Sequence, residues 1–153
     1  MSISNDLYKR AIFDHNRNPR NFHAMEDASH QCDGFNPLCG DKVSVFLKVN
    51  DAGSIEDVSF TGSGCAIFKA SASFMTGHIK GKTEQQAKDS VSIFVDMVKG
   101  NIDPQPDDPA MGKLAIFQGV REFPSRVKCA SLAWHALECA LEKKKEFSER
   151  EAE

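Results

Sequence analysis

The chain has 153 residues, of which 41% are hydrophobic and 27% charged, and this composition predicts a soluble protein with a single domain over residues 1–153. A net charge of −3 and a pI near 6.0 provide no basic field to neutralise phosphates, so nucleic acid is not expected as a partner. No segment reaches the roughly 18 to 20 apolar residues that span a bilayer, and residues 1–20 lack a signal-peptide core. We therefore expect no membrane association and a cytoplasmic location, where the five cysteines are expected to be metal ligands or reactive thiols rather than a disulfide framework.

The first part of the chain changes from helical to strand-like patterning. Leu7, Ala11 and Ile12 share one helical face ahead of Pro19, which cannot continue a helix. A polar stretch rich in Asn, Asp, Gly and Pro follows, and then two β-rich runs are separated by a turn-forming segment. This order predicts a helix over 4–16, a loop with one short edge strand over 31–35, and a hairpin with strands over 43–49 and 55–61.

The rest of the chain is predicted to be mainly helical. A small-residue run after Gly64 places Cys65 at the start of a helix, and Thr83 with Gln86 forms a capping box for the next one. Ser125 is expected to cap the last helix. The expected elements are helices over 65–75, 83–100 and 125–141, an insertion over 101–125 with an acidic loop and a short helical turn at 114–117, and a charged tail over 142–153 that frays into solvent.

This order of elements indicates the fold class. One helix precedes the strands and the remaining helices follow them, without the strand–helix–strand alternation that builds a parallel sheet. We therefore expect an α+β fold in which a small three-stranded antiparallel sheet is packed by helices on one face.

Three cysteines and one aspartate beside glycines or helix starts are the candidate metal ligands. Cys39 and Asp41 are separated by Gly40, whose free dihedral angles let both side chains turn toward one ion. Cys65 and Cys129 each fall in a predicted first helical turn, where unpaired N–H groups and the helix dipole favour a thiolate. Three thiolates and a carboxylate can complete the tetrahedral shell that zinc prefers and that iron–sulfur chemistry also uses. Because neither Cys65 nor Cys129 belongs to a C-x-x-C pair, buried structural cysteine remains the alternative.

Other polar residues are weaker candidates. Cys139 lies near the apolar stripe of the last helix and is expected to be an inert core residue. Three interpretations of Cys32 remain: an exposed thiol, a strand residue or a secondary sulfur acceptor. Arg126, three residues before Cys129, is expected either to stabilise a sulfur anion or pair with Asp41, or to form an ordinary surface salt bridge. The histidines are expected to be surface or capping residues rather than ligands.

Four sequence blocks in order are similar to the signatures of one protein family. They are D-H-N-R-N-P-R-N at 14–21, N-P-L-C-G-D at 36–41, G-S-G-C-A-I at 62–67 and R-V-K-C-A-S-L-A-W at 126–134. On these blocks the chain resembles the U-type iron–sulfur assembly family over nearly its whole length. It most resembles the SufU branch, because scaffolds of the IscU type carry histidine where this chain has Lys128, and because the long segment before Cys129 resembles the SufU insertion.

The resemblance implies a SufE/IscU-like (NifU-like) fold and a zinc ion held by Cys39, Asp41, Cys65 and Cys129. It further implies a sulfurtransferase that accepts persulfide sulfur from a SufS-type cysteine desulfurase and serves downstream iron–sulfur assembly proteins. We expect Cys39 to be the acceptor, because it is beside a glycine while Cys65 and Cys129 are anchored on helices.

Three alternatives to this function remain open. The first is a scaffold that binds iron as a [2Fe–2S] cluster through the same ligands. The second is a structural zinc domain that acts as an interaction module. A hydrolytic zinc enzyme is disfavoured, because no glutamate accompanies the ligands in a recognisable motif.

Overall fold

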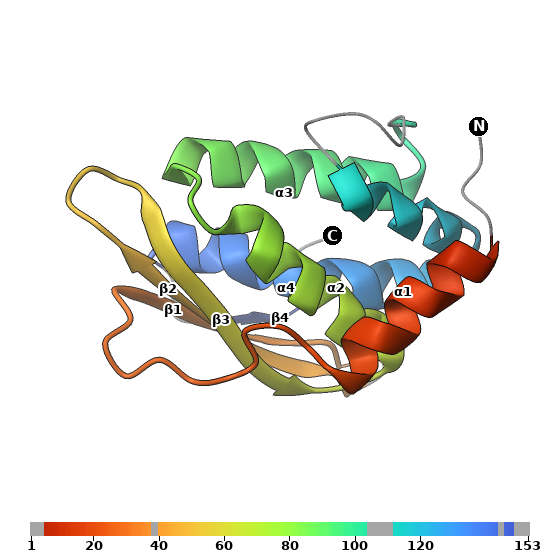
Figure 1. The fold of residues 1–153 in the computed structure, drawn as a ribbon, viewed down its shortest axis with the longest axis horizontal. Helices are drawn as coiled ribbons and strands as arrows, with labels where there is room; N and C mark the ends of the chain where they lie inside the picture. The colour runs from red at the N-terminus through yellow and green to blue at the C-terminus, as the bar shows by residue number, and fades with distance from the viewer. Residues whose placement is uncertain (1–4, 38–39, 104–111, 144–145, 149–153) are drawn as a thin grey trace.

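The computed structural model describes residues 5–37, 40–103, 112–143 and 146–148, and Figure 1 shows its helices lying together on one face of a sheet. The elements in chain order are α1 (Asn5–Arg17), β1 (His30–Phe35), β2 (Lys42–Val49), β3 (Ile55–Ser63), α2 (Ala66–Ile79), α3 (Glu84–Lys99), the 3₁₀ helix η1 (Gly112–Glu122), α4 (Pro124–Leu141) and β4 (Glu146–Ser148). Within the part of the chain described, none of the helices is both long and apolar enough to cross a membrane.

The sheet confirms the predicted fold class and adds one strand. Its order is β3-β2-β1-β4, and β1, β2 and β3 pair antiparallel as expected. The fourth strand, β4, comes from the charged tail that was predicted to fray, and it pairs parallel with residues 33–35 of β1. That prediction was wrong for 146–148, because strand pairing uses backbone N–H and C=O groups at the open edge of β1 and does not require apolar side chains.

The hydrophobic core begins between the sheet and helices α2 and α4 and extends to the inner faces of α3 and η1. Helices α2 and α4 contact the strands, while α3 packs on α4 and η1 as an outer layer. Trp134 of α4 is fully buried and stacks on Phe94 of α3 with ring centroids 4.3 Å apart. Its indole N–H donates to the Ser71 hydroxyl at 3.0 Å, and that hydroxyl donates to the Ala130 carbonyl at 2.6 Å. These bonds join α2 to α4 inside the core without leaving the indole N–H unpaired.

The ends of α3 agree with its sequence, whereas η1 and the start of α4 differ from prediction. Thr83 and Gln86 form the expected capping box, and Gly100 ends α3 in the left-handed conformation at φ 87°. The turn predicted at 114–117 is part of a longer 3₁₀ helix over Gly112–Glu122, in which residues 114–117 and Val120 are buried. The Ser125 cap was wrong: α4 starts one residue earlier, with Pro124 in its first turn and no side-chain cap. Proline suits this position because its missing N–H would be unpaired there in any case.

A disulfide joins Cys32 of β1 to Cys139 of α4, with their Cα atoms 6.0 Å apart. The expectation that the cysteines are metal ligands or reactive thiols was therefore wrong for these two, and Cys139 is buried but is not an inert thiol. Cys32 is a strand residue and is fully buried, so the exposed-thiol interpretation was also wrong. The pair was not predictable because the two cysteines are 107 residues apart and meet only where α4 packs on β1.

Candidate metal centre

Cys65 caps the N-terminus of α2. Its backbone is extended at φ −70° and ψ 169°, and its Sγ accepts a hydrogen bond from the Phe68 N–H at 3.5 Å. The thiol is exposed, while a hydrogen bond with Cys129 lowers the pKa of Cys65 to about 6. Burial and the neighbouring Asp41 carboxylate oppose this shift, and the Phe68 N–H reinforces it. The expected placement of Cys65 at a helix start is confirmed, and the cap favours the thiolate form that binds metals.

Asp41 lies at the end of a closed turn, directly before β2. The Asn36 N–H donates to the Asp41 carbonyl at 2.9 Å, and the Gly40 N–H donates to the Asn36 carbonyl at 2.8 Å. Gly40 has φ +78°, a left-handed conformation that other residues adopt at a cost. The Asp41 side chain is buried and accepts from the Cys65 N–H at 3.3 Å and from the Cys65 Sγ at 4.0 Å. The turn therefore holds a carboxylate against the cap of α2.

Gly64 lies against the Asp41 carboxylate, a contact that was not predicted from the sequence. A Cβ atom added there would lie 2.6 Å from the Asp41 Oδ1 and 2.8 Å from a ring carbon of Phe68. Such distances are below van der Waals contact, so only glycine lets the chain pass this close to the carboxylate. The available signal was the glycine directly before a candidate ligand cysteine.

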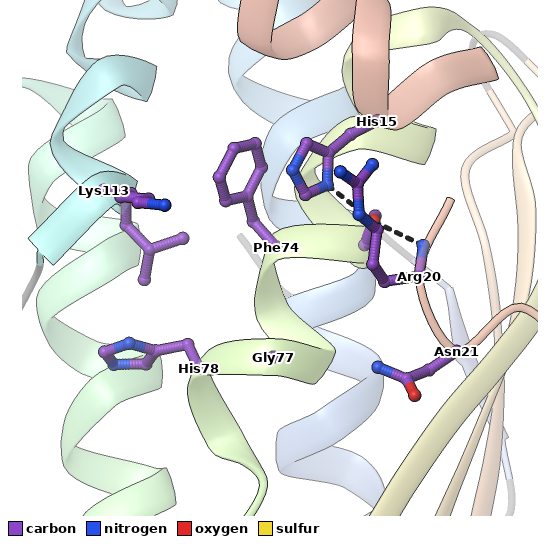
Figure 2. A pocket seen from close by; sticks show the side chains of 9 residues that line it. His15, Arg20, Asn21, Phe74, Gly77, His78 and Lys113 are labelled. Carbon is purple, nitrogen blue, oxygen red and sulfur yellow. Dashed lines mark hydrogen bonds between the residues drawn. The ribbon is translucent and has the colours of Figure 1, made fainter. Parts of the chain in front are cut away.

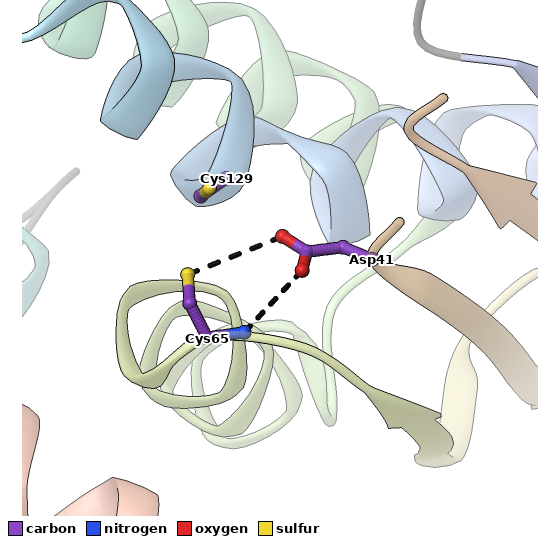
Figure 3. Close-up of side chains that lie close together, drawn as sticks. All are labelled: Asp41, Cys65 and Cys129. Atoms are coloured by element: carbon purple, nitrogen blue, oxygen red, sulfur yellow. Dashed lines mark hydrogen bonds between the residues drawn. The ribbon is translucent and has the colours of Figure 1, made fainter. Parts of the chain in front are cut away.

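Cys129 approaches the pair from α4 and is buried. Because α4 begins at Pro124, Cys129 lies in its second turn and not in the first turn as predicted, so the argument from unpaired terminal N–H groups applies to Cys65 alone. Figure 3 shows Asp41, Cys65 and Cys129 converging from β2, α2 and α4. One donor atom from each lies within 4.8 Å of the other two. The structure thus brings three of the four predicted ligands together, and the fourth, Cys39, lies outside the described residues.

This donor set fits a zinc ion. Zinc takes sulfur and oxygen donors in tetrahedral geometry at about 2.3 Å from sulfur, which separates two sulfur ligands by about 3.8 Å. The three donor atoms lie within 4.8 Å of one another, so zinc binding would bring the most distant of them closer by up to about 1 Å. Two thiols and one carboxylate leave one coordination position for a further ligand.

Arg126 lies on the exposed start of α4, one turn before Cys129. Its guanidinium carbon is 4.4 Å from the centre of the Phe123 ring, a cation–π arrangement. No contact between Arg126 and Asp41 is found among the described residues. Its proposed action on a sulfur anion stays a prediction.

Comparison with known proteins identifies relatives along nearly the whole chain. The family model for the NifU-like N terminal domain matches residues 7–146. The zinc-dependent sulfurtransferase SufU of Bacillus subtilis is 43% identical over 137 residues, which are 90% of each chain. The iron–sulfur cluster assembly scaffold protein IscU of Streptococcus pyogenes is 37% identical over 143 residues, covering 94% of this chain and 87% of that protein.

A solved structure shows the same fold. The putative iron–sulfur cluster assembly scaffold protein for the SUF system from Fervidobacterium islandicum superposes with a TM-score of 0.80 and 34% identity. The match covers 91% of this chain and 99% of that one.

Proposed function

The chain belongs to the family of NifU-like N-terminal domains, and from this we propose that it is a zinc-dependent sulfurtransferase for iron–sulfur cluster assembly. In this proposal it accepts persulfide sulfur from a SufS-type cysteine desulfurase. The observation that carries the proposal is the convergence of the Asp41, Cys65 and Cys129 donor atoms within 4.8 Å. The identity of 43% with a zinc-dependent sulfurtransferase supports it.

We propose Cys39 as the fourth ligand. It is two residues from Asp41 in the sequence, so their Cα atoms are at most about 7 Å apart. Of the described residues that flank it, the Asn36 N–H donates to the Asp41 carbonyl and the Gly40 N–H donates to the Asn36 carbonyl. When bound, zinc supplies positive charge that keeps the thiols deprotonated, and it has no redox chemistry of its own.

The sulfur transfer assigned to Cys39 balances without an external oxidant. The Cys39 thiolate attacks the outer sulfur of the desulfurase persulfide, so a new S–S bond forms on Cys39 as the S–S bond on the desulfurase breaks. The desulfurase cysteine leaves as a thiolate, and Cys39 keeps the transferred sulfur as its own persulfide. Asp41 directly precedes β2, Cys65 caps α2 and Cys129 lies in α4, so these three can stay in place while the acceptor reacts.

Arg126 is proposed as a second functional residue. It precedes Cys129 by three residues, a spacing that places both on one side of α4. A guanidinium there would favour a sulfur anion near the centre, at the expense of its contact with Phe123. We expect Arg126→Ala to slow sulfur transfer more than Arg126→Lys does, with zinc content unchanged in both.

A scaffold that holds a [2Fe–2S] cluster on the same ligands is the second candidate function. It is favoured by the 37% identity with the scaffold protein of Streptococcus pyogenes. Lys128 disfavours the scaffold function, because it stands where the IscU type carries a histidine directly before its last ligand cysteine. We also propose a cytoplasmic location and downstream iron–sulfur assembly proteins as further partners.

Zinc content and mass after sulfur loading test the proposal together. Purified protein is analysed for metals and then incubated with a cysteine desulfurase and cysteine before intact-mass measurement. We expect one zinc per chain and an added mass of about 32 Da, one sulfur atom, in the wild type. Cys39→Ala should abolish the added sulfur, whereas the matched control Cys32→Ala/Cys139→Ala should retain it.

Each other result points to a different function. Iron with acid-labile sulfide and no added sulfur would support the scaffold. Zinc without added sulfur would support a structural interaction module. An adduct that survives in Cys39→Ala would assign the acceptor to another cysteine.

A further inference from the structure

A cavity of about 420 Å³ lies beside the C-terminal half of α2, away from the metal centre. Gly77 in its wall is twelve residues after Cys65, which corresponds to about 18 Å along a helix axis. We call this cavity the α2 pocket, and its lining includes His15, Arg20, Asn21, Ser73, Gly77 and Lys113. Its volume is within the range of about 300 to 1,000 Å³ found for small-molecule sites.

The lining of the α2 pocket is basic. Arg20 and Lys113 contribute positive charges from opposite sides of the pocket, with Phe74 and His15 between them and Gly77 below in the view of Figure 2. The nine described residues that line the pocket include neither aspartate nor glutamate. Asp14 pairs with Arg20 at 2.7 Å but does not line the pocket, so it orients the guanidinium and partly offsets its charge. The surroundings therefore favour an anion over a cation.

Hydrogen bonds to α2 hold the Arg20 side of the pocket in place before any ligand binds. The Arg20 N–H donates to the Ser73 hydroxyl at 2.8 Å, and the Asn21 side-chain amide donates to the Thr76 hydroxyl at 2.9 Å. Asn21 has φ 57°, a conformation that asparagine tolerates better than most residues and that marks a constrained turn. The Asn21 carbonyl also accepts from the Phe60 N–H of β3 at 3.0 Å. A preformed site loses little entropy on binding.

His15 offers a neutral donor on the same side. Its Nδ1 lies 2.7 Å from the Ser73 hydroxyl, whose oxygen already accepts from the Arg20 N–H. If the hydroxyl donates to Nδ1, the imidazole carries its proton on Nε2 and can donate it to a ligand. Burial lowers the pKa of His15, the positive charges of Arg20 and Lys113 add to this shift, and the Asp14 carboxylate opposes it, so the neutral form of the ring is favoured.

We propose that the α2 pocket binds a small organic molecule carrying an oxyanion, a carboxylate or a phosphate, between Arg20 and Lys113. The guanidinium and ammonium supply charge-assisted hydrogen bonds to the oxyanion, and Asn21 and His15 flank it. The body of the ligand lies over Gly77, where an added Cβ meets no atom within 4 Å. This site is separate from the sulfur chemistry, and the inference does not depend on the proposed function.

Binding is tested on the zinc-loaded full chain by isothermal titration calorimetry with three probes. Succinate and inorganic phosphate represent the two sources of oxyanion, and succinamide is the uncharged match of succinate. We expect succinate or phosphate, but not succinamide, to bind at concentrations up to about 10 mM. Whichever of the two binds more tightly identifies the oxyanion.

Two pairs of variants locate the binding. Gly77→Leu fills the open wall and should abolish binding, whereas Gly77→Ala adds one methyl group and should retain it. Lys113→Ala should weaken binding about fivefold. Lys88→Ala, which removes an exposed lysine of α3 outside the pocket, should have no effect.

The variants also exclude the alternatives. Gly77 has no positive φ, so neither substitution there is strained, and circular dichroism checks that Gly77→Leu is folded. Absence of binding by both anions, equal binding of succinamide, or binding that persists in Gly77→Leu would each overturn the proposal. Sulfur loading at Cys39 is measured in parallel and should be unchanged in the Gly77 variants, which keeps a failure here distinct from a failure of the sulfurtransferase proposal.

Discussion

Breaking the Cys32–Cys139 bridge should strongly destabilise the protein. The bridge joins residues 107 apart, and the entropy lost when a loop of this length is closed in the unfolded chain corresponds to about 4.8 kcal/mol at 25 °C. For 153 residues the entropy of unfolding near the midpoint is about 0.3 kcal/mol/K. The reduced protein should therefore unfold about 15 °C below the oxidised protein.

Thermal unfolding followed by circular dichroism measures this difference. The zinc-loaded wild type and Cys32→Ala/Cys139→Ala are each heated with and without a phosphine reductant. Both proteins keep Cys65 and Cys129, so any effect of the reductant on the metal centre is common to the two. The bridge contribution is the change in Tm that the reductant causes in the wild type minus the change that it causes in the variant.

Two further results are expected from these unfolding curves, one for the Tm of the variant and one for the response to reductant. The variant should unfold near the Tm of the reduced wild type and below it by the cost of two truncated buried side chains, because Cys32 and Cys139 are both in the core. An equal response of both proteins to reductant, or a wild-type change below about 3 °C, would show that the bridge does not constrain the unfolded chain as argued. Disulfides are uncommon in a reducing cytoplasm. The curve of the wild type measured with reductant gives the stability of the dithiol form that such conditions would produce.

Three other substitutions test the pH response, the metal centre and the core. Burial lowers the pKa of His135 from 6.5 to about 4, so the unfolded chain binds a proton that the folded chain does not as the pH falls from 6.5 to 4. Stability is therefore lost across this window, and His135→Gln should flatten the dependence of Tm on pH; an unchanged slope would contradict the assignment. Gly64→Ala should displace the Asp41 carboxylate and weaken zinc at least about tenfold in a chelator competition, and equal affinity would refute the steric argument. Phe94→Ala, which removes the ring stacked on Trp134, should lower the free energy of unfolding in urea by about 3 to 5 kcal/mol, and a loss below about 1 kcal/mol would be inconsistent with a fully packed site.

Local patterns located the regular elements because their causes are local. The capping box of Thr83 and Gln86 and the ending of α3 at Gly100 depend on neighbours within one turn, and both are found in the structure. The alternation along β2 is found at Val43, Val45 and Leu47, which are buried, although Phe46 of the opposite face is buried as well. At the start of α4, however, two local signals competed, and Pro124 determined the first turn where Ser125 was expected to cap it.

The metal centre was only partly accessible from local patterns. The placement of Cys65 at a helix start and of Asp41 beside Gly40 followed from neighbouring residues. The meeting of these two with Cys129 depends on how α4 packs against α2, which no short stretch of sequence specifies. The four sequence blocks supplied that information through the family resemblance, and the match of the NifU-like N terminal domain to residues 7–146 confirms the family.

The sequence by itself determined the α+β class, the helices and hairpin, the ligand candidates and the family, because periodicity, caps and motifs are written in consecutive residues. The tertiary structure alone decided three further features: the bridge between Cys32 and Cys139, the pairing of β4 with β1, and the gathering of basic residues around Gly77. Each of these joins segments that are distant in the chain. Such contacts depend on the packing of whole elements, which is fixed by the summed burial of the core and not by any one local pattern.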